Sequence, residues 1–283
     1  MVSMKELMST AYKNHFAIPA VNVENADMLE GVISGAARVR APVIIQLTEP
    51  AAEAFGAGYA AYLAKYFAAK FDVPVGLHLD HASNEEIIMD CAAAGFTSVM
   101  LDFSECELSE IIKKSRQIMA KLKGMDIAIE AEIGLIGSMQ SETVKTDIED
   151  ARFLCGEVGC DMLAPSVGNV HGLSTKSARL DFDLLRALHS ELGLPIVLHG
   201  SSGTVEKDLE LAVDLGVTKV NFETEYRRIF QKTLMETLVL PPKIMKPREV
   251  LGVLRKEVSD RTEEKCRILR CCNKADLFRH NAQ

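Results

Sequence analysis

The segment "PVGLHLDHASNEEIIMDCAAAG" (74–95) combines the pattern of a strand with that of a helix. Its first seven residues form a short apolar run, which is typical of a buried strand. Residues 83–95 have helical character: Ser83 and Glu86 have the spacing of a capping box, and Gly95 is a typical helix end. The segment therefore predicts one β/α unit.

The same alternation continues along the chain. Apolar, β-branched runs predict eight strands, at 16–23, 42–48, 74–80, 98–103, 126–134, 161–168, 195–200 and 218–222. Helical segments are predicted between them, including 25–39, 83–95, 108–122 and 206–216. Eight such units in about 250 residues predict an α/β fold of the closed (β/α)₈ TIM-barrel type. An open doubly wound sheet is disfavoured because no G-x-G-x-x-G follows the first strand.

The domain organisation is expected to be simple. Helical sequence continues past the eighth strand until Pro241–Pro242, and a further helix is predicted from about Pro247 to Leu269. We find no linker that would define a second domain. The prediction is a single TIM-barrel domain over 1–283, with a helical C-terminal extension over about 241–283.

Composition narrows the classes of function. Among 283 residues, 32 Lys and Arg stand against 40 Asp and Glu, and a net charge of -8 argues against a nucleic-acid partner. No apolar run approaches the roughly 18 residues of a membrane span, and the N-terminus lacks the pattern of a signal peptide. The seven cysteines include no C-x-x-C pair, which predicts reduced thiols. We therefore expect a cytoplasmic protein without a membrane partner.

Polar residues gather near the predicted strand ends. In a barrel these ends meet at one face, which is where such enzymes hold their active sites. The residues concerned are Asn22, Thr48, His78, Asp80, His81, Asp102, Glu130, Glu132, His171, His199 and Asn221. A single strand-end histidine is more often a hydrogen-bonded structural residue than a ligand. Three from different strands, His81, His171 and His199, instead predict a catalytic Zn²⁺ site with an open fourth position.

A glycine and serine loop, "LHGSSGTVEKDLE" (198–210), leads from the seventh strand into a helix. Backbone N–H groups at Gly200 and Gly203, together with a helix N-terminus, favour an anion. An ordinary capped turn is the alternative. Because loops after the seventh and eighth barrel strands frequently bind phosphate, its position predicts a phosphate site.

Taken together, these motifs resemble a known family. "LHLDHAS", "EAEIGLIG", "GNVHG", "VLHGSSG" and "KVNFETE" occur in the order found in class II, metal-dependent ketose-bisphosphate aldolases. The resemblance extends from about Ala17 to about Pro247. It implies a TIM barrel that cleaves a phosphorylated ketose, and a homo-oligomer, either a dimer or a tetramer.

The resemblance also implies roles for individual residues. His81, His171 and His199 would bind Zn²⁺, and Asp80 would exchange a proton with the C4 hydroxyl of the sugar. Asp102 and Glu132 match carboxylates associated with a second divalent or a monovalent cation. Contacts with the phosphorylated sugar substrate are implied for Asn22, Thr48, Gly172, Gly200, Ser202, Asn221, Glu223, Thr224 and Arg227. His78, the remaining polar residue of this stretch, is expected to be a buried supporting residue.

The sequence departs from the family pattern at several places. Gln140 stands where a loop glutamate usually handles a proton, and an amide cannot act as a base at neutral pH. Glu142, two residues on, is the candidate substitute, because active-site loops move by more than that spacing. Lys243 and Ser174 replace an arginine and a tyrosine on the side of the distal phosphate.

These departures leave three hypotheses open. The first is a zinc-dependent aldolase acting on a ketose 1,6-bisphosphate of the fructose or tagatose type. The second is an aldolase that releases a different aldehyde from another phosphorylated ketose. The third is a sugar-phosphate-binding homologue with impaired turnover. A metal-dependent hydrolase is disfavoured because the first predicted strand lacks the H-x-H pair that such barrels commonly carry.

Overall fold

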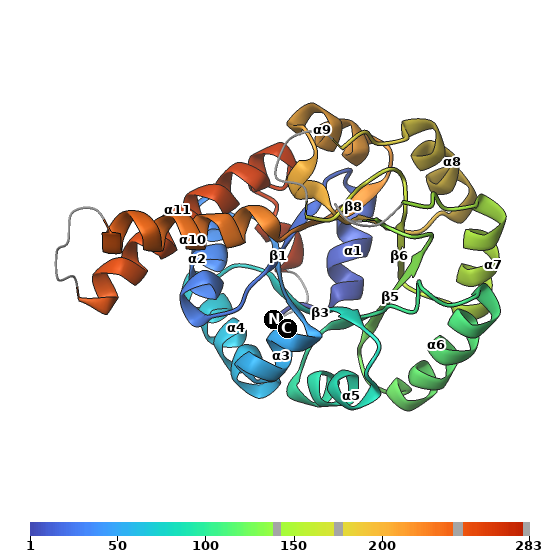
Figure 1. The fold of residues 1–283 in the computed structure, drawn as a ribbon, viewed down its shortest axis with the longest axis horizontal. Coiled ribbons are helices and arrows are strands. Elements are labelled where there is room, and N and C mark those ends of the chain that lie inside the picture. Colours follow the sequence, from blue (N-terminus) through green and yellow to red (C-terminus); the bar gives the residue numbers. More distant parts are fainter. Residues whose placement is uncertain (138–142, 173–177, 240–245, 280–283) are drawn as a thin grey trace.

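The computed structural model describes residues 1–137, 143–172, 178–239 and 246–279. Its strands form one closed parallel barrel in sequence order, in which β8 pairs with β1 (Figure 1). The strands are β1 (Ile18–Asn22), β2 (Val43–Thr48), β3 (Val75–Ala82), β4 (Ser98–Leu101), β5 (Ala128–Ile133), β6 (Met162–Pro165), β7 (Ile196–Leu198) and β8 (Val217–Phe222). The predicted α/β TIM barrel is confirmed.

Helices surround this barrel in a ring, except that the first helix lies across one end of it (Figure 1). They are α1 (Met4–Lys13), α2 (Ala26–Arg38), α3 (Glu49–Phe55), α4 (Ala57–Phe71), α5 (Glu85–Ala94), α6 (Leu108–Leu122), α7 (Ile148–Val158), α8 (Phe182–Leu192), α9 (Glu206–Asp214), α10 (Thr224–Val239) and α11 (Pro247–Ile268), with 3₁₀ turns η1 (Ser201–Gly203) and η2 (Ala275–Phe278). Within the described residues, no helix combines the length and apolar character needed to cross a bilayer. The strands are almost wholly buried, as expected when helices cover the outside of a parallel sheet.

The third strand differs from its prediction at the carboxyl end. The predicted strand stops at Asp80, whereas β3 continues to Ala82. Leu79 pairs with Val99 and Ala82 pairs with Leu101, so β3 contains one residue more than β4 between these pairs. Such a bulge changes the direction of a side chain without ending the strand. His81 lies within it and has a left-handed backbone, with φ of 50°.

The start of α5 corrects a second expectation. Asn84, not Ser83, is the N-cap residue, and its side chain accepts a hydrogen bond from the backbone N–H of Glu86. The backbone N–H groups of Ser83 and Asn84 both donate to Glu49 at the start of α3. A tertiary contact therefore holds this connection, and sequence spacing alone could not reveal it. The predicted end of the helix at Gly95 is confirmed, since Gly95 is the left-handed C-cap.

Helix α1 covers the amino end of the barrel, where β3 begins. The backbone N–H of Val2 donates to the carbonyl of Val75. A Cβ placed on Gly76 would lie 2.8 Å from Leu7 Cδ1 and 3.1 Å from Met4 Cε, so glycine permits the close packing of α1. The carboxyl ends of the strands stay available for a site.

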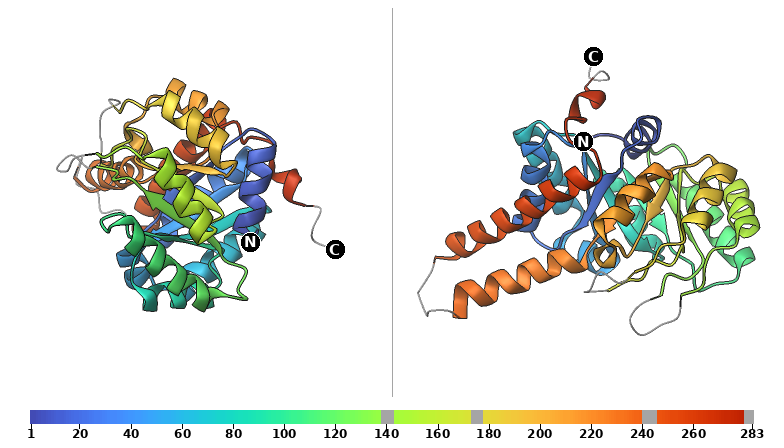
Figure 2. Two further views of the ribbon diagram at one scale, coloured as in Figure 1. Left: turned by 90° about the vertical axis from the view of Figure 1, so that its right-hand side faces the viewer. Right: turned by 90° about the horizontal axis from the view of Figure 1, so that it is seen from above.

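Helices α10 and α11 lie side by side and extend beyond the barrel (Figures 1 and 2). The helix α11 also packs closely on α2 through small residues. A Cβ on Gly31 would lie 2.8 Å from Val258 Cγ1, and one on Gly35 would lie 2.3 Å from the carbonyl oxygen of Ser259. The two glycines therefore set how near α11 approaches the barrel.

Replacing Gly35 with alanine should lower the free energy of unfolding by about 1–3 kcal/mol, because α11 must move away from α2. Gly252→Ala in α11 is the matched control, since a Cβ there meets only the Arg255 guanidinium, at 4.0 Å. That control should leave stability unchanged or raise it by up to about 1 kcal/mol, through helix propensity. Urea unfolding of both variants measures the difference, and equal effects would contradict the packing argument.

Candidate active site

A cavity of about 260 Å³ opens at the carboxyl ends of the strands. Its walls come from residues at or just after the carboxyl ends of β1, β2, β3, β6, β7 and β8, which converge because the barrel is closed. The lining residues are Asn22, Thr48, Asp80, His81, His171, Gly172, His199, Gly200, Ser201, Ser202, Asn221, Glu223 and Thr224. All but Ser201 were expected from the sequence.

Three imidazole rings meet at the base of this cavity. His81 comes from the bulge of β3, His171 from the segment after β6, and His199 directly follows β7. The centre of the His81 ring lies 5.3 Å from that of His171 and 4.8 Å from that of His199. The ring centres of His171 and His199 are 5.8 Å apart. Residues 118 positions apart in sequence thus come into contact, as predicted.

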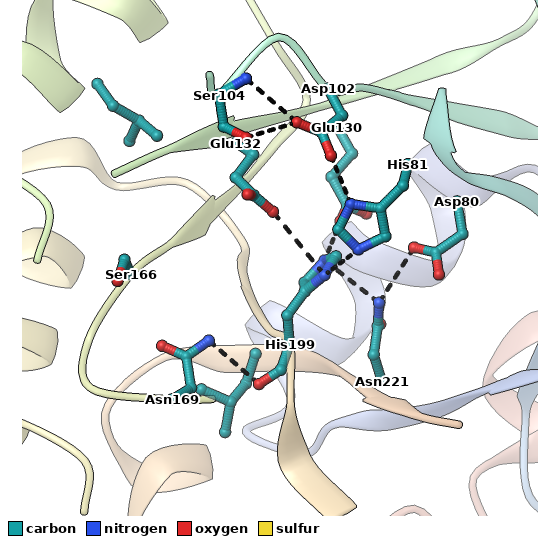
Figure 3. Close-up of polar contacts among 12 residues, drawn as sticks. Asp80, His81, Asp102, Ser104, Glu130, Glu132, Ser166, Asn169, His199 and Asn221 are labelled. Atoms are coloured by element: carbon teal, nitrogen blue, oxygen red, sulfur yellow. Dashed lines mark hydrogen bonds and ion pairs between the residues drawn. The ribbon is translucent and has the colours of Figure 1, made fainter. Parts of the chain in front are cut away.

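In His81 and His199, the nitrogen that does not face the other ring contacts a carboxylate (Figure 3). His81 Nδ1 lies 2.6 Å from Asp102 Oδ2, and His199 Nε2 lies 2.9 Å from Glu130 Oε1. Because a carboxylate accepts hydrogen bonds, we assign the ring protons to these two nitrogens. When both rings are neutral, the remaining nitrogens, His81 Nε2 and His199 Nδ1, face each other as lone pairs at 3.1 Å.

This donor set fits a divalent cation. Two lone pairs at this separation repel each other unless a proton or a metal cation lies between them, and metal-binding histidines typically donate their other ring N–H to a carboxylate. One nitrogen from each of His81, His171 and His199 lies within 4.8 Å of the others. Imidazole ligands suit Zn²⁺ as well as cobalt and iron.

A second group of possible ligands shares one histidine with the first. Ligand atoms of His81, Asp102 and Glu132 lie within 4.8 Å of one another. Glu132 is buried, and its Oε2 has no hydrogen-bond partner among the described residues. Burial raises the pKa of Glu132 to about 8. This oxygen lies 4.0 Å from His199 Nδ1, and a buried carboxyl oxygen without a hydrogen-bond partner suits a second or alternative cation position.

The charges around the cavity favour a cation. Burial alone would lower the pKa of His81, but Asp80, Asp102 and Glu132 reverse this and raise it to about 10. The pKa of His171 falls to about 4, because burial and then the charge of His81 disfavour its imidazolium form. His171 therefore offers a neutral nitrogen throughout the physiological range of pH.

Beneath the histidines lies a buried ion pair that connects β5 and β8. Lys219 Nζ donates to Glu130 Oε2 at 2.9 Å, and both side chains are fully buried. His78 is also buried, with Nδ1 at 2.7 Å from Ser98 Oγ and Nε2 at 3.5 Å from Glu130. His78 is thus a supporting residue, as predicted, and Lys219 is structural and not a surface residue.

The sequence interpretation missed the roles of Glu130 and Gln46. Glu130 was only one of many polar residues near strand ends, and its role depends on contacts with His199 and Lys219. Gln46 lies on β2, and its amide donates to both Asn22 and Asp80. For Gln46, the only signal in the sequence was a polar residue within an otherwise apolar predicted strand.

Asp80 is held by amide groups from three other strands. Its Oδ2 accepts from Asn22 at 2.9 Å and from Gln46 at 3.2 Å, and its Oδ1 accepts from Asn221 at 3.3 Å. Burial raises the pKa of this carboxyl, but His81 and other nearby cations outweigh burial and hold it below its usual value. Asp80 is therefore an ionised, fixed carboxylate that lines the cavity beside the imidazoles.

The loop after β7 contributes Gly200, Ser201 and Ser202 to the wall of the cavity. Gly200 has φ of 61°, and a Cβ there would lie 2.6 Å from the carbonyl oxygen of Val170. The 3₁₀ turn η1 follows at once, whereas α9 begins only at Glu206. Of these two elements, η1 lines the cavity through Ser201 and Ser202, whereas α9 contributes no lining residue. Backbone N–H groups of such a loop, together with the Ser202 hydroxyl, suit a phosphate group.

The remaining predicted residues lie elsewhere. Arg227 is not among the residues that line the cavity, and its guanidinium pairs with Glu223 and, at 3.4 Å, with Glu24. Asp102 is also not among the residues that line the cavity, and it contacts His81 Nδ1. Glu142 and the other positions that depart from the family pattern, Gln140, Ser174 and Lys243, lie outside the described residues.

A TIM barrel with three imidazoles and a fixed carboxylate at its strand ends has the arrangement typical of barrel enzymes with a metal site. Comparison with known proteins identifies the family. The family model "Fructose-bisphosphate aldolase class-II" matches residues 2–274. The chain belongs to the class-II fructose-bisphosphate aldolase family, within the aldolase lyases, and the resemblance found from its motifs is confirmed.

Individual relatives agree with this membership. The chain is 31% identical over 261 residues to the fructose-bisphosphate aldolase of Geobacillus stearothermophilus, covering 89% of this chain and 91% of the relative. The crystal structure of the YdjI aldolase from Escherichia coli K12 matches with a TM-score of 0.86, 30% identity and coverage of 97% and 99%. The fructose-bisphosphate aldolase of Campylobacter jejuni matches with a TM-score of 0.82, 27% identity and coverage of 96% and 95%.

Glu130→Gln should weaken Zn²⁺ binding about 10–100-fold, because an amide is a weaker acceptor for His199 and leaves Lys219 unpaired. Competition with a chromophoric chelator measures the affinity. Glu149→Gln on the surface of α7 is the control and should bind like the wild type. If Glu130→Gln unfolds, the double variant with Lys219→Met removes the unpaired charge, and wild-type affinity in either folded variant would contradict the assigned role.

Proposed function

We propose that this chain is a zinc-dependent aldolase that reversibly cleaves a ketose 1,6-bisphosphate of the fructose or tagatose type. The products are dihydroxyacetone phosphate and glyceraldehyde 3-phosphate. The observation that carries the proposal is the meeting of three imidazoles and the Asp80 carboxylate in one cavity. Family membership supports the reaction class.

The metal-site residues in this proposal are His81, His171 and His199, with Asp102 and Glu132 available to a second divalent or a monovalent cation. When bound, the divalent cation polarises the ketose carbonyl and so lowers the barrier to cleavage. This supplies, without a Schiff base, the electron withdrawal that the reaction needs. Lys219 is not available as an amine nucleophile, because it is buried and paired with Glu130.

Asp80 is proposed to remove the proton of the C4 hydroxyl. As the C4 carbonyl forms, the C3–C4 bond breaks and its electron pair remains on the ketone fragment as an enediolate, which is then protonated at C3. The amides of Asn22, Gln46 and Asn221 keep the carboxylate from rotating away from the sugar. Such positioning lowers the barrier because the base needs no reorganisation.

The loop after β7 and the start of α10 are proposed to hold the phosphate of the ketone fragment. Gly172, Gly200, Ser202, Asn221, Glu223 and Thr224 line the same cavity as Asp80. Asn22 and Thr48, from the ends of β1 and β2, complete the sugar contacts. Arg227 is the candidate for the distal phosphate, which requires its guanidinium to leave Glu223 and Glu24.

A second candidate function concerns the aldehyde half of the substrate. The pairing of Arg227 with two carboxylates reduces its availability to a distal phosphate, and Lys243 and Ser174 depart from the family pattern on the same side. An aldolase that releases a different aldehyde from another phosphorylated ketose would fit these features.

The chain's expected single-domain organisation, cytoplasmic location and dimeric or tetrameric assembly stay predictions.

A coupled assay of dihydroxyacetone phosphate release across a panel of ketose phosphates tests the proposal. Fructose or tagatose bisphosphate should be cleaved fastest, and a chelator should abolish release until Zn²⁺ is restored. Asp80→Asn should keep its Zn²⁺ while losing about 10²–10⁴-fold in turnover. Faster cleavage of another ketose phosphate would instead favour the second candidate, and chelator-resistant release would contradict the metal requirement.

Variants of the loop residues test the base that acts on the enediolate. If Glu142 replaces the usual glutamate, Glu142→Ala should lower turnover, whereas Gln140→Glu should leave it equal or higher. Unchanged turnover in Glu142→Ala would contradict this role. An inactive parent that gains turnover from Gln140→Glu would support a sugar-phosphate-binding homologue with impaired catalysis.

A further inference from the structure

Two thiols lie together at the amino end of the barrel, away from the cavity. Cys155 is in the last turn of α7, and Cys160 lies two residues before β6 begins at Met162. Their sulfur atoms are 3.7 Å apart. The candidate active site is at the carboxyl ends of the strands, so neither thiol belongs to it.

The two thiols differ in their access to solvent. Cys155 is partly exposed, whereas Cys160 is buried. The intervening Gly156 and Gly159 are exposed, and a Cβ on either would meet no atom within 4 Å. Gly159 is the left-handed C-cap of α7, with φ of 72°. The turn is therefore open to a small reagent, which would reach Cys155 before Cys160.

The hydrogen bond between the thiols gives them different chemical character. Cys160 donates its S–H to the sulfur of Cys155. This donation lowers the pKa of Cys155, while the same contact and burial raise the pKa of Cys160. Since the thiolate is the nucleophile in thiol chemistry, Cys155 is the more reactive of the two. Cys91 is a contrasting case, because burial raises its pKa to about 12.

We propose that Cys155 and Cys160 are a redox-active dithiol, which a low-molecular-weight disulfide such as oxidised glutathione converts into an intramolecular disulfide. The Cys155 thiolate attacks the reagent, forming a mixed disulfide and releasing one glutathione thiolate. The Cys160 sulfur, after losing its proton, attacks Cys155 and releases the second glutathione. Two protein thiols are oxidised, and one glutathione disulfide is reduced to two glutathione thiols.

The movement that this reaction requires is small. A disulfide has a sulfur–sulfur bond of about 2.0 Å, so the atoms must approach by roughly 1.7 Å from their 3.7 Å separation. Rotation of the two short side chains and adjustment at the exposed glycines can supply this. The disulfide would connect the end of α7 to the segment that enters β6.

The sequence allows a direct measurement. Trypsin cleavage after Arg152 and Lys176 yields peptide 153–176, whose only cysteines are Cys155 and Cys160. The folded chain is treated with oxidised glutathione and then unfolded in iodoacetamide. The wild-type peptide should be lighter by two hydrogen atoms and carry no alkyl group, and dithiothreitol should restore two alkylated cysteines. Two alkylated cysteines after oxidation, or a lasting glutathione adduct, would overturn the proposal.

Single variants test the order of attack. Cys160→Ser should retain glutathione on Cys155, because the second attack is lost. Cys155→Ser should leave Cys160 free of glutathione, and an adduct there would contradict the assigned nucleophile. Cys106→Ser is the matched control: Cys106 is another partly exposed thiol, with Lys114 Nζ at 3.3 Å, and its loss should leave disulfide formation unchanged.

Discussion

The candidate site depends on the contacts of one buried carboxylate. Glu130 accepts hydrogen bonds from the Lys219 ammonium and from the His199 ring. These contacts cross the barrel interior from β5 to β8, and the charged side chains that make them are fully buried. Removing such charges from water costs several kcal/mol per ion, so each must be compensated by a close partner. The compensation also fixes which nitrogen of His199 faces the cavity.

The arrangement above this pair depends on one irregularity in the backbone. Along a regular strand, His78 and Asp80 point to the same side, and His81 would point to the other. The bulge of β3 and the left-handed conformation of His81 bring its ring toward His199 instead. Adjacent residues can therefore supply both a ligand and a base. The barrel tolerates this conformation because the pairs on either side of the bulge keep β3 in the sheet.

The two ends of the barrel have different chemistry. At the amino end, apolar side chains of α1 pack on Gly76, and the thiols of Cys155 and Cys160 lie beside the entry to β6. At the carboxyl end, amides, imidazoles and carboxylates surround a cavity. Because catalytic loops follow the strands, the carboxyl end can vary in chemistry while the amino end stabilises the fold. A disulfide at the amino end would add a constraint without touching the candidate site.

The sequence by itself determined the barrel, since strand and helix periodicity are local, and it predicted that His81, His171, His199 and Asp80 would converge at the strand ends. It did not reveal the roles of Glu130 and Gln46, nor that Asn84 replaces Ser83 as the cap. Those features depend on residues far apart in the chain. Only the closed barrel brings them together, because its geometry decides which buried polar group meets which partner, and burial makes each such pairing necessary.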